Sequence, residues 1–525
     1  MYRLTLQWSN FFVKQLCEED LVPTLEVVTE TNVGVYFSDY FKVDKEVIER
    51  YGAFNISLVT DLPLFIDPFL LFNSKKPQYR KLHDDIIKYL RFLKDKSITQ
   101  SIGSGTLKAW YTFREVEQNW LGFSAIGNRG SGLGTDFAKA LNRNLINVFD
   151  TPGQKQVTQG SHLEKLCLIK DGVGRDNISD FTTNLIKGFL LEYTQTFALQ
   201  HISQDLRATF RIERAYFNYT TESWEERTFE LPKFGSSFVI LTPKALLTKD
   251  DTWINKADLI KDFEQIPTMI DDDELRFKVN NYFLSQLSLN PEREGKKPTQ
   301  KEREAAAAGT LQEFPSVLID YYIKLKEDQG DKATSISGEK VAFSEGFFIE
   351  NVQQCIAGLQ KIGFYLPTAN SYEEARKKIN DLKGYIENND GYRLFYYKGK
   401  RIQGEKELQL MFGLICHNST LSDVNREPNN GRGPVDATLS RSRLDKTLVE
   451  FKLASNKKLE QNLQKQVEIY QKANGTQLSF KVIVYFNEDE LLKVNAVLNK
   501  LGITGKPHII LIDARNDNKP SASNA

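Results

Sequence analysis

The sequence predicts a multidomain protein of the α/β plus α class, and three observations carry this prediction. The chain has 525 residues, enough for roughly two to four domains at about 100–200 residues each. Hydrophobic residues make up 40% of it, so it can bury several cores. The spacing of these residues changes along the chain, which predicts a mixed, then a helical, then a strand-rich region. We place these regions and a short tail at 1–150, 151–389, 390–515 and 516–525.

The first region, 1–150, is predicted to be a mixed α/β domain with a role in recognition or assembly. Apolar residues at helical spacing predict a helix over 79–93. A glycine-rich loop, 127–134, leads into a second helix over 135–149, for which Thr135 is a suitable N-cap. Short apolar runs predict strands at 25–28, 33–37, 56–59, 106–113 and 121–124.

The middle region, 151–389, is predicted to be mainly helical. Stretches with an apolar period near 3.6 lie at 178–201, 257–263, 273–289, 311–325, 347–362 and 371–387. Two stretches lack this period. Residues 291–308 are charged and poor in large apolar side chains, and residues 327–340 are rich in Gly, Ser, Asp and Lys. We expect both to be exposed loops.

The last region, 390–515, is predicted to alternate between helices and strands. An amphipathic helix at 405–417 opens the series, and the order from there is αββαβαβ. The later elements are expected at 435–440, 447–453, 459–473, 480–486, 488–500 and 508–513. The tail, 516–525, is small and polar, and we expect it to be disordered.

Charge and cysteine content narrow the classes of function. The 69 Lys and Arg residues balance the 69 Asp and Glu residues, so any binding of nucleic acid must depend on a local patch. The four cysteines are far apart and form no CxxC pair, which argues against a disulfide scaffold and a cysteine zinc site. The N-terminal residues do not resemble a signal peptide, and no apolar run is long enough to span a bilayer. We therefore expect a cytoplasmic protein without a membrane partner.

One group of residues in the last region is typical of a catalytic metal site. Glu450 and Lys452 lie two apart in a predicted strand and therefore share one face of it. Asp436 opens the preceding strand and would approach Glu450 if the two strands form a hairpin. Carboxylate oxygens suit Mg²⁺, which takes substrate phosphate as a further ligand. A lysine beside them stabilises the charge that develops during hydrolysis. A solvated strand face, with Glu450 and Lys452 paired to Asp445 and Lys446, is the plainer alternative.

The pattern Asp436, Glu450-Phe-Lys452 resembles the signature of the PD-(D/E)xK nuclease superfamily, with Pro434-Val-Asp436 in place of its Pro-Asp. The resemblance implies a restriction-endonuclease-like αβββαβ core in the C-terminal domain. It also implies Mg²⁺ as the cofactor, or Mn²⁺ in its place.

Two flanking helices extend the resemblance. The preceding helix carries Glu405 and Glu407, and such nucleases often have a metal-supporting glutamate there. The choice between the two is open, and the Glu-x-x-Leu-Gln order favours Glu405. The metal ligands implied are then Asp436, Glu450 and Glu405. On the following helix, Gln466 and Tyr470 resemble the QxxxY element of the RecB-like branch and share one helix face. They are expected to act with the catalytic residues, and an ordinary amphipathic helix surface is the plainer alternative.

Basic residues concentrate around this group. Between Arg441 and Lys472 there are eight basic and four acidic residues, and we expect nucleic-acid phosphates to bind there, with Lys457 and Lys458 among the contacts. For the individual lysines, a solvated charged helix is the alternative. Arg426 and Arg432 lie in the loop before the strand and are placed to clamp a phosphate.

The resemblance implies a metal-dependent endonuclease in restriction or anti-phage defence. DNA is the expected substrate, and RNA stays open as the alternative. Residues 1–389 would then sense, recognise or assemble, as a homo-oligomer or with a partner protein. Two other functions remain. One is a nucleic-acid-binding or scaffold protein that keeps a nuclease fold, and the other is a small-molecule enzyme that uses the loop at 127–134.

Overall fold

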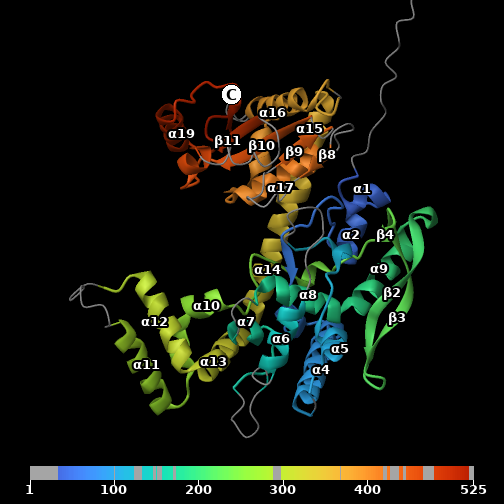
Figure 1. Ribbon diagram of the computed structural model, residues 1–525, viewed down its shortest axis with the longest axis vertical. Helices are drawn as coiled ribbons and strands as arrows, with labels where there is room; N and C mark the ends of the chain where they lie inside the picture. The colour runs from blue at the N-terminus through green and yellow to red at the C-terminus, as the bar shows by residue number, and fades with distance from the viewer. Residues whose placement is uncertain are drawn as a thin grey trace, which may run out of the picture. The chain divides into compact units, whose positions relative to one another are not determined.

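The computed structural model is drawn in Figure 1 with its helices and strands labelled. It describes residues 34–99, 101–122, 133–145, 149, 157–169, 173–287, 297–366, 368–417, 423–425, 437–441, 445–464 and 478–519. Among these residues, no helix has both the length and the apolar character needed to cross a membrane.

The described part of the first region is mainly helical. Its elements are α1 Phe37–Phe41, α2 Lys45–Tyr51, β1 Leu64–Ile66, α3 Pro68–Phe72, α4 Pro77–Thr99, α5 Ser104–Thr106 and α6 Thr135–Asn144. Helix α4 confirms the helix predicted at 79–93, and its buried face includes Ile86, Leu90 and Leu93. Helix α6 confirms the start at Thr135, but Gly134 rather than Thr135 is the N-cap.

The strand predictions for this region were mostly wrong. At 56–59 only Ser57 pairs, through an isolated bridge to Tyr36, and residues 104–111 are helical instead of extended. Short apolar runs fit a buried helical turn as well as a strand, so periodicity alone did not separate the two. The run at 33–37 passes into α1 at Phe37, and Leu121 of the run at 121–124 makes a bridge to Leu62. The run at 25–28 lies outside the described residues.

The middle region is helical with one long β-hairpin. Its helices are α7 Lys165–Ile169, α8 Arg175–Leu185, α9 Lys187–His201, α10 Lys256–Lys261, α11 Asp273–Leu287, α12 Gln300–Glu313, α13 Pro315–Asp328, α14 Gly330–Glu345, α15 Val352–Lys361 and α16 Ser371–Asn388. Its strands are β2 Arg207–Asn218, β3 Ser223–Phe234, β4 Ser237–Phe238 and β5 Leu247–Lys249. Strands β2 and β3 pair antiparallel, and the sequence-based description of this region lacks them.

Two segments predicted as exposed loops are largely helical. Residues 330–345 form α14, because its small residues Ala333 and Ser337 pack closely, with the Ser337 hydroxyl 3.3 Å from that of Thr248 in β5. In the other segment, 291–308, residues from Gln300 onward belong to α12. Thr299 caps this helix and accepts a hydrogen bond from the backbone N–H of Glu302. Residues 288–296 lie outside the described part of the chain.

The last region contains a five-stranded mixed sheet in the order β12-β11-β10-β9-β8. Strands β8, β9 and β10 are antiparallel neighbours, whereas β10, β11 and β12 are parallel. The elements are β6 Tyr396–Tyr397, β7 Lys400–Arg401, α17 Glu405–Cys416, β8 Asp423–Asn425, β9 Ala437–Ser440, β10 Lys446–Leu453, β11 Ser479–Tyr485, α19 Glu488–Lys500 and β12 Ile509–Asp513. Residues 459–464 are also helical. From residue 405 onward the predicted helices and strands are present over their described residues, and β8 is an addition to them.

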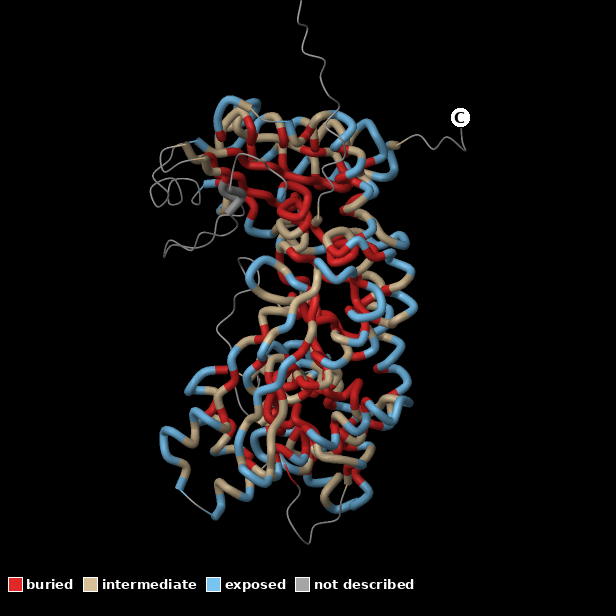
Figure 2. Tube along the Cα trace, turned by 90° about the vertical axis from the view of Figure 1, so that its right-hand side faces the viewer, coloured by how far each residue is buried: buried red, intermediate tan, exposed pale blue. Residues whose placement is uncertain are grey.

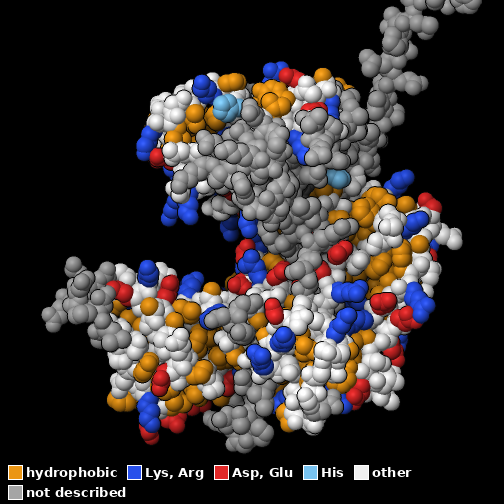
Figure 3. All heavy atoms as spheres, viewed as in Figure 1, with side chains coloured by type: hydrophobic (Ala, Val, Ile, Leu, Met, Phe, Trp, Pro, Cys, Tyr) orange, Lys and Arg blue, Asp and Glu red, His pale blue; other side chains and the backbone are white. Residues whose placement is uncertain are grey.

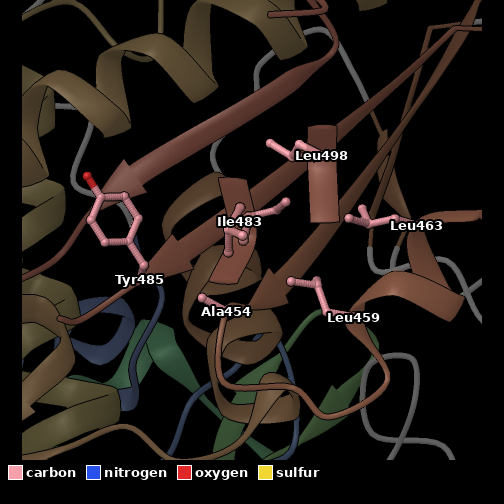
Figure 4. Packing of buried hydrophobic residues seen from close by; sticks show 7 residues of the cluster. Ala454, Leu459, Leu463, Ile483, Tyr485 and Leu498 are labelled. Atoms are coloured by element: carbon pink, nitrogen blue, oxygen red, sulfur yellow. The ribbon is translucent and has the colours of Figure 1, made fainter. Parts of the chain in front are cut away.

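Both faces of this sheet are covered by apolar side chains. On one face, Phe451 of β10 packs on Phe412 of α17, with ring centroids 3.9 Å apart. On the other face, Ile483 of β11 and Leu498 of α19 belong to one buried cluster, which also includes Tyr485 (Figure 4). The strands are accordingly buried along most of their length (Figure 2).

Helix α16 packs against this sheet, although its residues were assigned to the middle region. The backbone N–H of Ser371 donates to the carboxylate of Asp445, and the Ser371 hydroxyl lies 2.9 Å from that of Thr447. At the other end of α16, Glu387 accepts a hydrogen bond from the backbone N–H of Asp513. The start of the tail, 516–519, is also held in place, since Asn518 donates to Asp513. The expected disorder is therefore wrong for 516–519, and 520–525 lie outside the described residues.

Candidate active site

Strand β10 carries the two charged residues that define the candidate site. Glu450 and Lys452 are 6% and 5% exposed in a strand whose neighbouring residues are apolar from Leu448 to Leu453. Phe451, between them, packs on α17, so the two charged side chains share the opposite face, as predicted. The alternative of a solvated strand face is wrong, because both residues are buried and Asp445 is engaged by the backbone of α16.

Glu405 of α17 lies beside the end of β10. One of its carboxylate oxygens accepts hydrogen bonds from the backbone N–H of Leu453, at 3.1 Å, and from the side-chain amide of Asn456, at 2.7 Å. The other lies 3.8 Å from the Lys452 ammonium. Glu407 turns elsewhere and accepts a hydrogen bond from Lys249 at 2.5 Å. Of the two candidate glutamates, Glu405 is therefore the one at the site.

A second buried lysine, which the sequence did not bring to attention, faces Glu450 from the neighbouring strand. Lys481 of β11 is opposite Glu450 in the parallel register and is 2% exposed. Its ammonium donates to the carbonyl of Leu463 at 2.7 Å. Burial lowers the pKa of Lys481 to about 8, although the nearby Glu450 carboxylate opposes this shift. The sequence feature that could have identified Lys481 is its charge inside the apolar run 480–486.

The environment of Glu450 sets its ionisation. Burial raises the pKa of Glu450, and the negative charge of Glu405 adds to this effect. The ammonium groups of Lys452 and Lys481 act in the opposite direction. Two acidic and two basic side chains thus compensate one another in a place where a single buried charge would cost several kcal/mol.

A divalent cation fits the donor chemistry of this group. Among the residues that the structure describes, no hydrogen-bond donor contacts the Glu450 carboxylate, which leaves its hard oxygens for a cation. Glu405 offers a second carboxylate. The same described residues contain no cluster of three acidic, histidine or cysteine side chains close enough to bind a metal by themselves. A complete site would thus need further ligands, such as water and substrate phosphate.

Other predicted site residues divide into two groups. Lys457 and Lys458 are exposed in the turn that follows β10, so they are accessible to a ligand. Five predicted residues lie outside the described part of the chain: Asp436, Gln466, Tyr470, Arg426 and Arg432. Asn456, which the sequence did not single out, links Glu405 to the turn that carries the two lysines.

Comparison with known proteins identifies two regions without assigning a chemistry to either. Residues 42–255 match the model of a domain of unknown function (DUF8370), and residues 371–488 match that of another domain of unknown function (DUF8371). No curated protein and no solved structure matches the chain. The second match begins at the first residue of α16 and includes the whole of β8 to β11. It therefore contains Glu405, Glu450, Lys452 and Lys481.

Proposed function

We propose that the C-terminal region is a metal-dependent nuclease that hydrolyses phosphodiester bonds of DNA. The observation that carries this proposal is the buried placement of Glu450 and Lys452 on one face of β10, with Glu405 beside the same strand end. Buried charges are rarely retained without a partner or a role.

The connectivity of the sheet also supports the proposal. From α17 onward the chain passes through three antiparallel strands, and then through helices to two parallel strands. This order agrees with the αβββαβ core that the resemblance to PD-(D/E)xK nucleases implies. The central strand of that core is the one that would carry the catalytic pair.

The chain's own residues have separable tasks in this proposal. The carboxylates of Glu450 and Glu405 would hold Mg²⁺, which when bound supplies charge stabilisation at phosphate and an activated water. Lys452 would stabilise negative charge on the phosphate as it is attacked. Asn456 holds the Glu405 carboxylate in position, and Lys481 favours ionised Glu450. Asp436, Gln466 and Tyr470 belong to the proposal on the resemblance alone.

Substrate binding would depend on local cations, because the chain has no net charge. Lys457 and Lys458 are exposed beside the end of β10 and are the described candidates for phosphate contacts. A place in restriction or anti-phage defence is the setting that the resemblance implies. A comparison of phage infection in cells with the wild-type and Glu450→Gln genes tests that setting.

The direct test is cleavage of plasmid and of single-stranded oligonucleotides, both DNA and RNA, with Mg²⁺ or EDTA. We expect Mg²⁺-dependent cleavage of DNA that falls by about 100-fold or more in Glu450→Gln and in Lys452→Met. Glu460→Gln and Lys500→Met are matched controls, since they remove the same groups from an exposed ion pair, and they should cleave like the wild type.

Binding of DNA measured in EDTA separates a nuclease from a protein that only binds nucleic acid. Glu450→Gln should bind DNA at least as tightly as the wild type, because it removes one negative charge near the phosphates. Cleavage at the wild-type rate by either site variant would overturn the assignment. A wild-type protein that binds DNA tightly but does not cleave any substrate would instead indicate a nucleic-acid-binding or scaffold protein.

A further inference from the structure

A large cavity lies in the region that matches the first family model, among elements that the nuclease proposal does not use. Its volume is about 900 Å³, within the range of small-molecule sites. The wall is formed by the helical turns around residue 108, by the start of α6, by the junction of α8 and α9, and by β2 and β4.

The lining combines an apolar floor with a positively charged rim. Aromatic and aliphatic side chains on the floor include Phe113, Leu133, Ile212, Phe238 and Ile240. Six cationic side chains line the same cavity: Lys108, Arg114, Lys139, Lys187, Arg211 and Arg214. Arg211 is paired with Glu226, and only two acidic residues, Glu115 and Glu213, are among the described lining residues, so cations that lack an ion pair predominate. On the face shown in Figure 3, Lys and Arg side chains gather where α8 and β2 lie in Figure 1.

Two of these cations are held in fixed positions. Arg214 has a φ of 54° at an irregularity in β2, and its guanidinium donates to the carbonyls of Thr112, at 2.9 Å, and Ala109, at 2.7 Å. Lys187 donates to the carbonyl of Glu213 at 2.8 Å. Both sets of hydrogen bonds go to neutral carbonyl groups, and neither side chain forms an ion pair within the described residues.

Three other cations in the cavity have no acidic partner. Lys108, Arg114 and Lys139 are exposed, and within the part of the chain that the structure describes none of them forms an ion pair. The start of α6 adds to this positive potential. Its N-cap is Gly134, which supplies no side-chain acceptor for the N–H groups of the first turn, and Gly134 and Thr135 both line the cavity. Free N–H groups at the start of a ten-residue helix attract phosphate.

We infer that this cavity binds a nucleotide, with its phosphates on the cationic rim and its base on the apolar floor. Several cations together with the helix start suit the charge of one or more phosphates. Phe238, which is half-buried, supplies the flat apolar surface that a nucleobase requires and that a plain sugar phosphate or inorganic anion does not use. A volume of about 900 Å³ is sufficient for a whole nucleotide.

The state of Lys187 is consistent with an anionic ligand. Burial and the nearby Arg214 lower the pKa of Lys187 to about 8. The Glu213 carboxylate opposes this shift, and a phosphate beside the ammonium would likewise favour its charged form. The site is separate from Glu450 and Lys452 in the chain, and the inference therefore does not depend on the proposed nuclease activity.

The test is calorimetry with the full-length protein in EDTA, so that metal-dependent cleavage does not contribute. ATP, GTP, CTP and UTP are titrated, with adenosine and pyrophosphate as the two half-ligands. We expect at least one nucleotide to bind with a Kd in the micromolar range and at least tenfold more tightly than either half-ligand. A 5′-phosphorylated oligonucleotide in a parallel titration distinguishes a free nucleotide from a nucleotide at a strand end, since both carry the recognised chemistry.

Two substitutions test whether the nucleotide binds in this cavity. Arg114→Met and Lys139→Met remove exposed cations without an ion-pair partner, so the fold should tolerate both changes, and each should weaken nucleotide binding by about tenfold. Lys81→Met is the matched control, because Lys81 is an exposed lysine of α4 that pairs with Asp85. Absence of binding by every nucleotide and by the oligonucleotide at millimolar concentration would overturn the inference. So would wild-type affinity in both cavity variants, or pyrophosphate binding as tightly as a nucleotide.

Discussion

Removal of the Glu405 carboxylate should loosen the end of β10 as well as slow cleavage. This carboxylate accepts hydrogen bonds from Leu453 and Asn456 and lies 3.8 Å from Lys452. Hydrogen bonds to a charged group contribute about 1.5–3 kcal/mol each. Because the Glu405 side chain is 22% exposed, water can replace part of the loss. We therefore expect Glu405→Ala to reduce the free energy of local opening by about 2–3 kcal/mol, which multiplies exchange of the nearby amide hydrogens by about 30 to 150.

Glu405→Gln separates the hydrogen bonds from the charge. The glutamine oxygen can still accept from Leu453 and Asn456, whereas the attraction to Lys452 is lost. Its effect on local opening should be about 1 kcal/mol, or about fivefold in the exchange rate. Cleavage should fall strongly in both variants, because both remove a carboxylate that would hold Mg²⁺.

Hydrogen–deuterium exchange followed by mass spectrometry measures these differences on peptides that include 446–456. Glu407→Gln is the matched control, since Glu407 bonds to Lys249 rather than to β10, and it should leave exchange of these peptides unchanged. The reasoning is refuted if Glu405→Ala exchanges like the wild type across β10, or if Glu405→Gln is as strongly affected as Glu405→Ala.

Two further predictions concern stability. Burial, reinforced by nearby acidic residues including Glu115 and Asp180, raises the pKa of Asp61 to about 8. Between about pH 4 and pH 8, Asp61 therefore keeps its proton in the folded protein and loses it in the unfolded chain. The free energy of unfolding should fall as the pH rises through this range. Asp61→Asn should then raise the melting temperature at pH 8 but change it little at pH 5, and an equal change at both pH values in a thermal-shift assay would contradict this. A fragment of residues 368–525 should fold because it includes α16, whereas a fragment of 390–525 should aggregate because it lacks the contacts of Ser371 and Glu387 with the sheet. Size-exclusion chromatography and NMR of both fragments give the comparison, and a well-folded shorter fragment would show that α16 is dispensable.

The sequence predicted the C-terminal region better than the rest for identifiable physical reasons. There, long amphipathic helices and apolar strands alternate, and each period is distinct. In the first region, short apolar runs such as 106–113 are compatible with either structure, and the chain adopts helical turns. The β2–β3 hairpin was missed although its strands are 12 residues each. The half-exposed faces of these strands mix aromatic and charged residues, which weakens the alternation of apolar and polar residues that identifies a strand in a sequence.

The candidate site shows the same limit at the level of single residues. The alternation of a strand was sufficient to place Glu450 and Lys452 on one face. Glu405 and Glu407 both begin α17, and only contacts between distant segments separate them, with Asn456 in one case and Lys249 in the other. Lys481 was missed because the pairing of parallel strands depends on the register of two segments that are far apart in sequence.

The opposite positions of Glu450 and Lys481 in neighbouring strands have a consequence for how the central strands find their alignment during folding. Most of the other residues of strands β10 and β11 are apolar, so they contribute less than buried charges to fixing one alignment. A slip of one residue would turn one strand over, so that Lys481 and Glu450 pointed to opposite faces of the sheet. Each buried charge would then have lost the opposite charge beside it, which would destabilise that alignment by several kcal/mol. The same residues that are proposed to perform chemistry therefore also make misaligned sheets unfavourable, and a variant with both charges replaced by apolar residues should fold into a less uniquely aligned sheet.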